Sequence, residues 1–137
     1  MGLVGHAKAL IASLPEDTQA EALALLALAE QDFSAAIEKF STLINSDPHH
    51  SLIHSSNLAL THLYVADGQS AISVLEPKLR EPQNPIAILP PAIYNLCTMY
   101  EIRDDKARAR KEGIMENIVG RYGDVCGKGH FKLDSLR

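Results

Sequence analysis

The sequence predicts an all-α fold: a right-handed superhelical array of about three helical hairpins that pack side by side. Two observations predict it. The same landmark residues return along the chain at steps of 35 and 38 residues, which is typical of proteins built from repeated hairpins. No segment alternates apolar and polar residues for long enough to form a strand. With 137 residues, 46% of them hydrophobic, the chain has the length of a single domain.

The landmarks are a large–small pair of residues and an alanine followed four residues later by a large residue. The pair recurs as Leu23-Ala24, Leu58-Ala59 and Leu96-Cys97, and the second landmark as Ala36-x-x-x-Phe40 and Ala71-x-x-x-Leu75, with Ala109 as the matching alanine of the third unit. Pro48 closes the first unit. This order matches the tetratricopeptide repeat (TPR), a helical hairpin of about 34 residues. We interpret the alanines as the positions where paired helices approach most closely.

The elements follow in order along residues 1–119, which we assign to the repeat domain. A partial helix at 3–13 has no partner before it and resembles the second half of an earlier repeat, so we expect the chain to be part of a longer array. Three units follow, at about 17–50, 51–86 and 90–119. Their predicted helices are 17–30, 33–46, 51–66, 69–80, 91–103 and 105–121. Residues 120–137 form a Gly-rich C-terminal tail.

Local signals support several of these limits. Thr18 and Glu21 resemble a capping box at the start of the first full hairpin. Asp47-Pro48 and Asp67-Gly68 predict turns. Pro77 lies inside the helix predicted at 69–80, and we expect it to kink or shorten that helix, because proline lacks the amide hydrogen that a helix interior needs.

The third unit carries a more specific string, Asn95-Leu-Cys-Thr-Met-Tyr-Glu101. Together with Leu58-Ala-Leu-Thr-His-Leu-Tyr-Val65 and Phe131-Lys-Leu133, it resembles the C-terminal tetratricopeptide region of the subunit 12 family of the trafficking protein particle (TRAPP) complex. The resemblance covers the chain from about residue 20 onward. It implies a non-catalytic subunit of a tethering and Rab-activating assembly in ER–Golgi traffic, whose exchange activity belongs to the complex.

Composition excludes several other classes of function. The formal net charge of −4 argues against a nucleic-acid binder, which needs a basic face to neutralise phosphates. No apolar run approaches the roughly 18 residues of a membrane span, so we expect no direct membrane insertion. Two cysteines are too few for a disulfide scaffold, which favours the cytoplasm. The mixed charges of 103–112 indicate a solvated helix face laced with i,i+4 ion pairs; a patch for a membrane or an acidic partner is the alternative.

No catalytic motif or metal-ligand set is present, and we predict no enzyme activity, no cofactor and no metal. His50 and His54 are spaced i,i+4, and Cys126 and His130 have a ligand-like spacing, but neither pair has a second pair to complete a zinc site. We therefore interpret the histidines as solvated residues at loops and helix starts. Cys97 occupies a small-residue position, which predicts a buried and inert thiol.

The tetratricopeptide pattern implies a concave groove lined by the first helix of each unit. In this register the groove includes Glu21, Ser56 and Glu101 and seven candidate partner-binding residues: Leu25, Leu28, Ile53, Leu60, Leu63, Tyr94 and Thr98. Because this surface is mostly apolar, we expect its ligand to be a helix or an extended apolar segment. The alternative occupant is the chain's own tail, through Phe131, Leu133 and Leu136.

We therefore predict a non-catalytic protein-binding scaffold, cytoplasmic and peripheral to ER–Golgi membranes, whose partners are other subunits of a TRAPP-like complex. The alternative is a tetratricopeptide adaptor or co-chaperone that captures short peptides. Co-chaperones of this type hold a terminal carboxylate with lysine, asparagine and arginine; here only Asn57 and Asn95 are candidates, so this alternative is disfavoured.

Overall fold

The computed structural model describes residues 2–82, 84, 88–103, 105–123 and 128–133. Within these residues every regular element is a helix, which confirms the all-α prediction. The elements are α1 (Leu3–Ala12), α2 (Glu16–Ala29), α3 (Phe33–Ser46), η1 (Pro48–His50), α4 (Ser51–Tyr64), α5 (Gly68–Leu79), α6 (Leu89–Arg103), α7 (Ala107–Tyr122) and η3 (Lys128–Phe131). The α-helices agree with the predicted helices to within two residues at each end.

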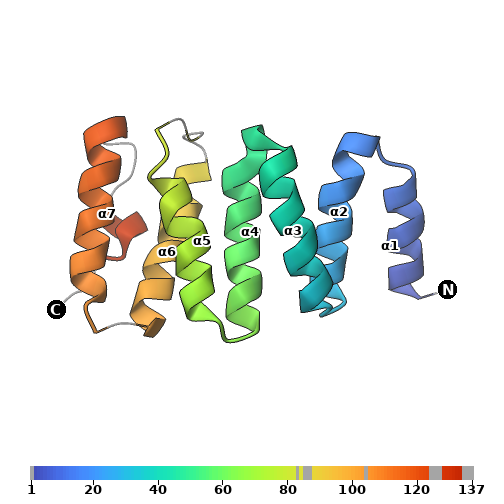
Figure 1. Ribbon diagram of the computed structural model, residues 1–137, viewed down its shortest axis with the longest axis horizontal. Coiled ribbons are helices and arrows are strands. Elements are labelled where there is room, and N and C mark those ends of the chain that lie inside the picture. Colours follow the sequence, from blue (N-terminus) through green and yellow to red (C-terminus); the bar gives the residue numbers. More distant parts are fainter. Residues whose placement is uncertain (1, 83, 85–87, 104, 124–127, 134–137) are drawn as a thin grey trace.

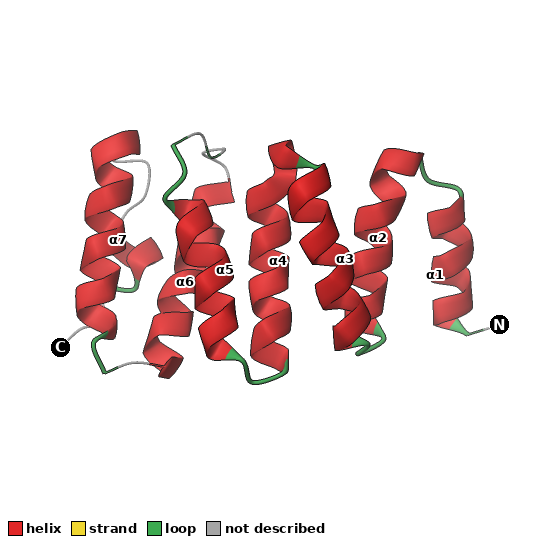
Figure 2. Cartoon of the chain, viewed as in Figure 1, coloured by secondary structure: helices red, strands yellow, loops and turns green. Residues whose placement is uncertain are grey.

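The helices stand side by side in chain order, with α1 and α7 at opposite ends of the row (Figure 1). Each α-helix packs against the next one along the chain, and α4 also contacts α6. Short connections join the helices within the described parts of the chain (Figure 2). This is a row of antiparallel hairpins. Its right-handed superhelical twist and the unit limits 17–50, 51–86 and 90–119 stay predictions.

Two hairpin turns have the same backbone geometry, 35 residues apart. Gln31 after α2 has φ 62° and Ala66 after α4 has φ 61°, the left-handed conformation that ends many helices. The amide that follows each of them closes the turn: Asp32 donates to the Ala27 carbonyl at 2.9 Å, and Asp67 to the His62 carbonyl at 2.8 Å. The sequence repeat is therefore also a repeat of conformation.

The same two aspartates start the next helices. The Asp32 carboxylate accepts the Ala35 amide at 3.1 Å, and the Asp67 carboxylate accepts the Ser70 amide at 3.0 Å. Each satisfies an N–H that has no partner inside the first turn of a helix. One residue thus ends one helix and begins the next, which explains the tight turns inside both hairpins.

The core consists of two clusters. The smaller joins α2, α3 and α4 through Ala24, Ala27, Ala36, Phe40, Leu43 and Leu58. The larger runs from α4 to η3 and includes Ala59, Ala71, Leu75, Leu96, Ile114 and Phe131. The landmark alanines at 24, 36, 59 and 71 are fully buried, as expected where helices approach closely. Cys97 is also buried, as predicted, and burial raises the pKa of its thiol to about 12. The prediction for Ala109 is wrong: it is exposed, because α7 turns Lys111, Ile114 and Ile118 to the interior instead.

One local prediction needs correction. Thr18 caps nothing: α2 begins at Glu16 after Pro15, and the Thr18 hydroxyl donates back to the Pro15 carbonyl at 2.9 Å. Pro77 does lie inside α5, which ends two residues later at Leu79; the kink expected there stays a prediction. Helix α7 ends at Tyr122, one residue beyond its predicted end.

Candidate partner-binding surface

The seven predicted groove residues lie on three helices, and none of them is fully buried. Leu25 and Leu28 are on α2, Ile53, Leu60 and Leu63 on α4, and Tyr94 and Thr98 on α6. Leu25 and Tyr94 are exposed and the other five are half-buried. Their side chains are thus available at the surface, although half-buried leucines also support the packing beneath them.

Four of these leucines adjoin a tyrosine that the sequence analysis did not select. Leu25 and Leu28 line one depression with Ala29, Gln31, Phe33 and Tyr64. Leu60 and Leu63 line a second depression, again with Tyr64. Because Tyr64 borders both, the two depressions form one apolar surface. We call it the Tyr64 surface, consisting of Leu25, Leu28, Phe33, Leu60, Leu63 and Tyr64.

The sequence analysis did not identify the aromatic pair at the centre of the Tyr64 surface. The rings of Phe33 and Tyr64 stack at a centroid distance of 5.7 Å with an interplanar angle of 8°, and Tyr64 is 68% exposed. Phe33 opens α3 and Tyr64 closes α4, so both flank the hairpin turns. The position of both residues next to the two hairpin turns is the sequence signal that could have indicated this pair. Stacked aromatic rings that stay exposed are common anchors in protein interfaces.

Ile53, Tyr94 and Thr98 lie outside the Tyr64 surface. Ile53 is near the start of α4, away from both depressions. Tyr94 and Thr98 face the chain's own C-terminal segment instead: the Lys132 ammonium lies 5.2 Å from the centre of the Tyr94 ring and donates to the Thr98 hydroxyl at 3.3 Å. Phe131 beside it is fully buried and Leu133 is half-buried. Leu136 lies outside the described residues.

Glu101 links this segment to α7. Its carboxylate accepts hydrogen bonds from both Lys111 and Lys132, and the Lys111 ammonium also donates to the Lys132 carbonyl at 3.3 Å. Partial burial alone would raise the pKa of Glu101, but the two ammonium groups outweigh it and hold that pKa below its ordinary value. The Thr98 end of the predicted groove is therefore polar, with its charges paired.

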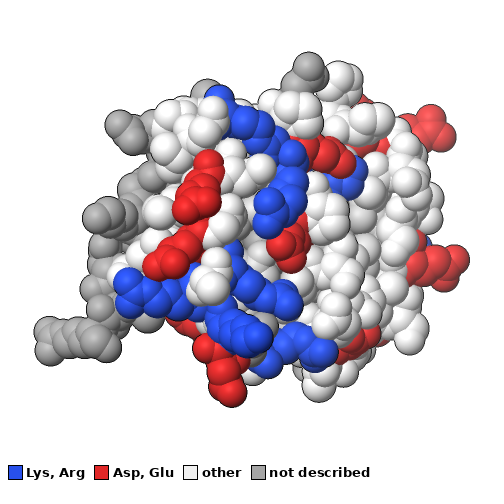
Figure 3. Space-filling model, turned by 60° about the vertical axis from the view of Figure 1, so that its left-hand side comes forward, with Lys and Arg blue, Asp and Glu red and all other residues white. Residues whose placement is uncertain are grey.

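The predicted solvated face at 103–112 is partly wrong. Charges of both signs intermingle on the side of the molecule that the C-terminal helices form (Figure 3), and Arg108 pairs with Glu112 at 3.0 Å, as the i,i+4 pattern predicts. Lys111, in contrast, is only 1% exposed. Its side chain points inward because Glu101 and the tail carbonyl supply partners there.

The histidines differ in their exposure to solvent. His49 and His50 are exposed as predicted, whereas His54 is fully buried. Asp47 binds two of them: its carboxylate accepts His50 Nδ1–H at 2.8 Å and His54 Nε2–H at 3.2 Å. Across the described residues, no three His, Cys, Asp or Glu side chains are placed to hold a metal ion.

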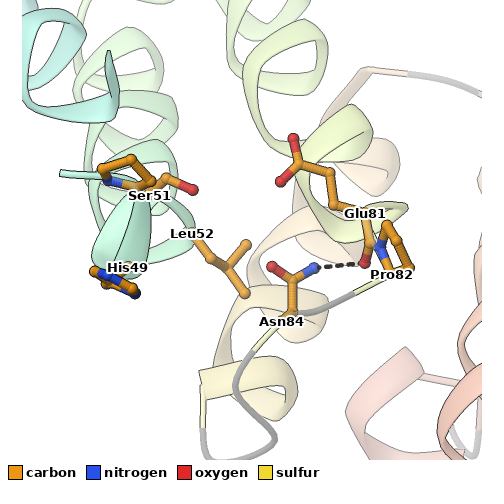
Figure 4. A pocket seen from close by; sticks show the side chains of 7 residues that line it. His49, Ser51, Leu52, Glu81, Pro82 and Asn84 are labelled. Carbon is orange, nitrogen blue, oxygen red and sulfur yellow. Dashed lines mark hydrogen bonds between the residues drawn. The ribbon is translucent and has the colours of Figure 1, made fainter. Parts of the chain in front are cut away.

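A depression lies between η1 and the segment that follows α5 (Figure 4). It is lined by Pro48, His49, Ser51, Leu52, Glu81, Pro82 and Asn84. The Asn84 side-chain amide donates to the carbonyls of Lys78 and Glu81, at 2.7 and 3.2 Å, so it holds the connection after α5 in place.

Comparison with known proteins finds two similar proteins that carry the same name. Trafficking protein particle complex subunit 12 of Homo sapiens is 28% identical over 111 residues, which are 80% of this chain and 15% of that protein. The Mus musculus subunit 12 is 26% identical over the same share of this chain and 14% of its own length. The resemblance inferred from the sequence is confirmed. This chain is similar to TRAPP complex subunit 12.

The chain spans only about one seventh of the length of these relatives. Both names place the relatives in a trafficking complex, and neither denotes an enzyme. No family model matches the chain, and no solved structure matches it. No helix in the described parts of the chain is long and apolar enough to cross a membrane.

Proposed function

We propose that this chain is a protein-binding scaffold segment without catalytic activity, and that its partners are other subunits of a TRAPP-like complex. The Tyr64 surface carries the proposal, because it places four exposed or half-buried leucines around a stacked aromatic pair. An apolar surface of this kind suits the apolar face of a partner helix or an extended apolar segment. The similarity to subunit 12 supports the type of assembly.

Within such a complex the chain would act in ER–Golgi vesicle-mediated transport, in the cytoplasm and peripheral to the membranes. The tetratricopeptide arrangement is part of the same proposal. It is supported by the turns repeated after 35 residues and by the contact of α4 with α6.

Changing Leu25, Leu28, Leu60 and Leu63 together to glutamine tests the Tyr64 surface. We expect the tagged variant to lose the TRAPP subunits that co-purify with the unchanged chain, as measured by quantitative mass spectrometry. Circular dichroism has to show that the helices persist, since three of the four leucines are half-buried. Ile102→Gln is the control, because Ile102 is 68% exposed and lies outside the surface. Retention of every subunit by the quadruple variant would refute the proposal.

The alternative, an adaptor that captures peptide carboxylates, needs an available cation beside Asn57 or Asn95. The Asn95 side chain donates to the Ser56 hydroxyl at 3.3 Å. Lys132 reaches Thr98 on the same helix, but it is paired with Glu101, so its charge is already compensated. Calorimetry with an acidic C-terminal peptide should give no binding heat; saturable binding would favour the adaptor.

A further inference from the structure

The depression between η1 and the segment that follows α5 has polar oxygen atoms on both of its sides (Figure 4). Its volume is about 500 Å³, within the roughly 300–1,000 Å³ of pockets that hold a small ligand. Ser51, the first residue of α4, forms one side, and Glu81 and Asn84 form the other. Leu52 lies between them and is 2% exposed. Ser51 and Asn84 are themselves only 8% and 9% exposed, so both are built into the fold.

The hydrogen bonds of Asn84 define the orientation of its side chain. The side-chain nitrogen donates to the carbonyls of Lys78 and Glu81, and a carbonyl oxygen can only accept. The side-chain oxygen of Asn84 therefore faces the opposite way, toward Leu52 and the depression (Figure 4). The backbone is fixed as well, because the Asn84 N–H donates to the Tyr122 hydroxyl of α7 at 2.9 Å. The oxygen is thus held in place before a ligand arrives, which reduces the ordering cost of binding.

Among the described residues, three acceptors in the depression lack a partner. Nothing in the described parts of the chain hydrogen-bonds the Asn84 side-chain oxygen or the Ser51 hydroxyl, which points into the same space (Figure 4). One oxygen of the Glu81 carboxylate accepts from Lys78 at 2.9 Å, and no described residue donates to the other. Polar groups as buried as Ser51 and Asn84 rarely lack a partner, because each unmade hydrogen bond costs stability. Their position around one cavity indicates a ligand that donates hydrogen bonds.

We propose that this depression binds the guanidinium group of an arginine side chain. A guanidinium carries five N–H donors in a planar fork and no acceptor, so it can donate to Ser51 on one side and to Asn84 and Glu81 on the other. The second Glu81 oxygen supplies the opposite charge. Leu52 and Pro82 add apolar walls, along which the aliphatic stem of the arginine packs.

Other classes of ligand fit these acceptors less well. The start of α4 alone would favour an anion, but an anion has no hydrogen to donate to Asn84 and is repelled by Glu81. A lysine ammonium has a charge of the right sign, yet its three donors diverge from a single nitrogen. The acceptors stand on opposite sides of the depression (Figure 4), which favours the broader, planar group.

This site is separate from the Tyr64 surface and does not depend on it. Ser51 is the first and Tyr64 the last residue of the 14-residue helix α4, so the two sites lie about 20 Å apart along that helix. Failure of the tests below would leave the proposed function untouched, and loss of the proposed function would leave this site in place.

The test uses three short peptides that differ in one side chain: acetyl-Ala-Arg-Ala-amide and its lysine and citrulline counterparts. Citrulline has the shape of arginine without the charge. Each peptide is titrated into the ¹⁵N-labelled chain at physiological salt, and the signal of the Asn84 side-chain amide is followed by NMR. The arginine peptide should shift this signal to saturation, with an affinity at least fivefold above that of the lysine peptide and tenfold above that of the citrulline peptide. Absence of saturation, or equal binding of the arginine and lysine peptides, would overturn the proposal.

A pair of carboxylate variants checks that binding occurs at this depression. Glu81→Gln should weaken binding of the arginine peptide at least fivefold, whereas Glu38→Gln should leave it unchanged. Glu38 is the matched control, because it is also an exposed carboxylate and lines a different depression of about 370 Å³. Equal weakening by both variants would mean that the peptide is attracted only by the net negative charge of the chain, against the proposal.

Ser51→Ala separates a role in binding from a role in folding. The hydroxyl that it removes has no partner among the described residues, so the melting temperature should stay the same or rise while the arginine peptide binds more weakly. A lower melting temperature with unchanged binding would assign the hydroxyl to the fold and contradict its place in the site.

An arginine of another protein and an arginine elsewhere in the same polypeptide share this chemistry, and cross-linking in cells distinguishes them. A benzophenone amino acid replaces His49, which is exposed and lines the depression. A captured segment from the same polypeptide identifies an internal occupant, and one from another protein identifies a partner. Either supports the proposal only when the segment has an arginine near the attachment point and Glu81→Gln lowers the yield. A captured segment without a nearby arginine would overturn the proposal.

Discussion

Asp47 binds two histidines with very different surroundings. His50 is exposed and His54 is fully buried, and both donate to the same carboxylate oxygen. The hydrogen bond from His50 contributes most to the lowered pKa of Asp47. The other ring nitrogen of His54 is buried without a partner. Asp47 is thus the one described group that compensates the buried imidazole.

Asp47→Ala should therefore destabilise the protein by about 1–3 kcal/mol, the usual cost of leaving a buried polar group without its hydrogen bond. Asp47→Asn should cost less, because its amide oxygen still accepts a hydrogen bond. Urea unfolding measures both. Glu38→Ala on the exposed side of α3 is the control, and an Asp47→Ala effect no larger than the control would mean that this contact contributes nothing.

Glu101 predicts a pH dependence with a definite sign. Its pKa in the folded protein lies below its ordinary value of 4.5, so the unfolded state binds more protons as the pH falls below that value. Stabilisation by Glu101 is present above about pH 4.5 and is lost as the pH falls through the folded pKa. The free energy of unfolding of the unchanged chain should therefore decrease on acidification, and less steeply in Glu101→Gln.

Lys111→Met is a second variant that tests the same pH dependence. It removes one of the two ammonium groups that keep the Glu101 carboxylate charged, so it should also reduce the slope of stability against pH. Parallel curves for the unchanged chain and both variants, measured by urea unfolding between pH 6 and pH 3.5, would show that the pair has no energetic role.

Among the elements, η3 is anchored in the large core cluster through Phe131. Phe131 is fully buried in the larger core cluster, and η3 contacts both α6 and α7. Phe131→Ala should lower the free energy of unfolding by about 3 kcal/mol, the lower end of the range for buried phenylalanines, because a short terminal segment can relax. Leu133→Ala, at a half-buried position, should cost clearly less. Equal losses in urea unfolding would indicate that Phe131 is no anchor.

The sequence was sufficient to predict the helices but not the tertiary partners of charged groups. Helix limits depend on local signals, such as Asp32 and Asp67 after the turns, and these were read to within two residues. The capping box predicted at Thr18 was wrong, because the Thr18 hydroxyl donates to the nearby Pro15 carbonyl instead. The burial of Lys111 depends on Glu101 and on the tail carbonyl of Lys132. Neither contact follows from a helical period, since they join residues 10 and 21 positions apart.

The candidate site, too, could be predicted from the sequence only in part. The groove leucines follow from the period of the first helices, and four of them do line depressions. The Phe33–Tyr64 stack brings together the start of α3 and the end of α4, a distance in sequence that no single-helix pattern covers. The contact of Lys132 with Tyr94 and Thr98 likewise requires the path of the tail.

At the scale of the whole molecule, the array is stabilised unevenly along its length. The large cluster joins α4 to η3, the smaller one joins α2 to α4, and α1 belongs to neither. Because each hairpin contacts mainly its neighbours, opening can start at one end without unfolding the rest. Amide hydrogen exchange should therefore be fastest in α1, slower in α2 and α3, and slowest in α4–α6.

Two glycine substitutions separate local opening from global unfolding. Ala9 in α1 and Ala109 in α7 are both exposed, so Ala9→Gly and Ala109→Gly each weaken a helix by about 1 kcal/mol without removing core contacts. Ala109→Gly should lower the urea midpoint of the whole chain, since α7 supplies Ile114 and Ile118 to the large cluster. Ala9→Gly should speed exchange in α1 and leave the midpoint almost unchanged. Equal shifts of the midpoint would mean that α1 unfolds together with the rest, as part of one cooperative structure.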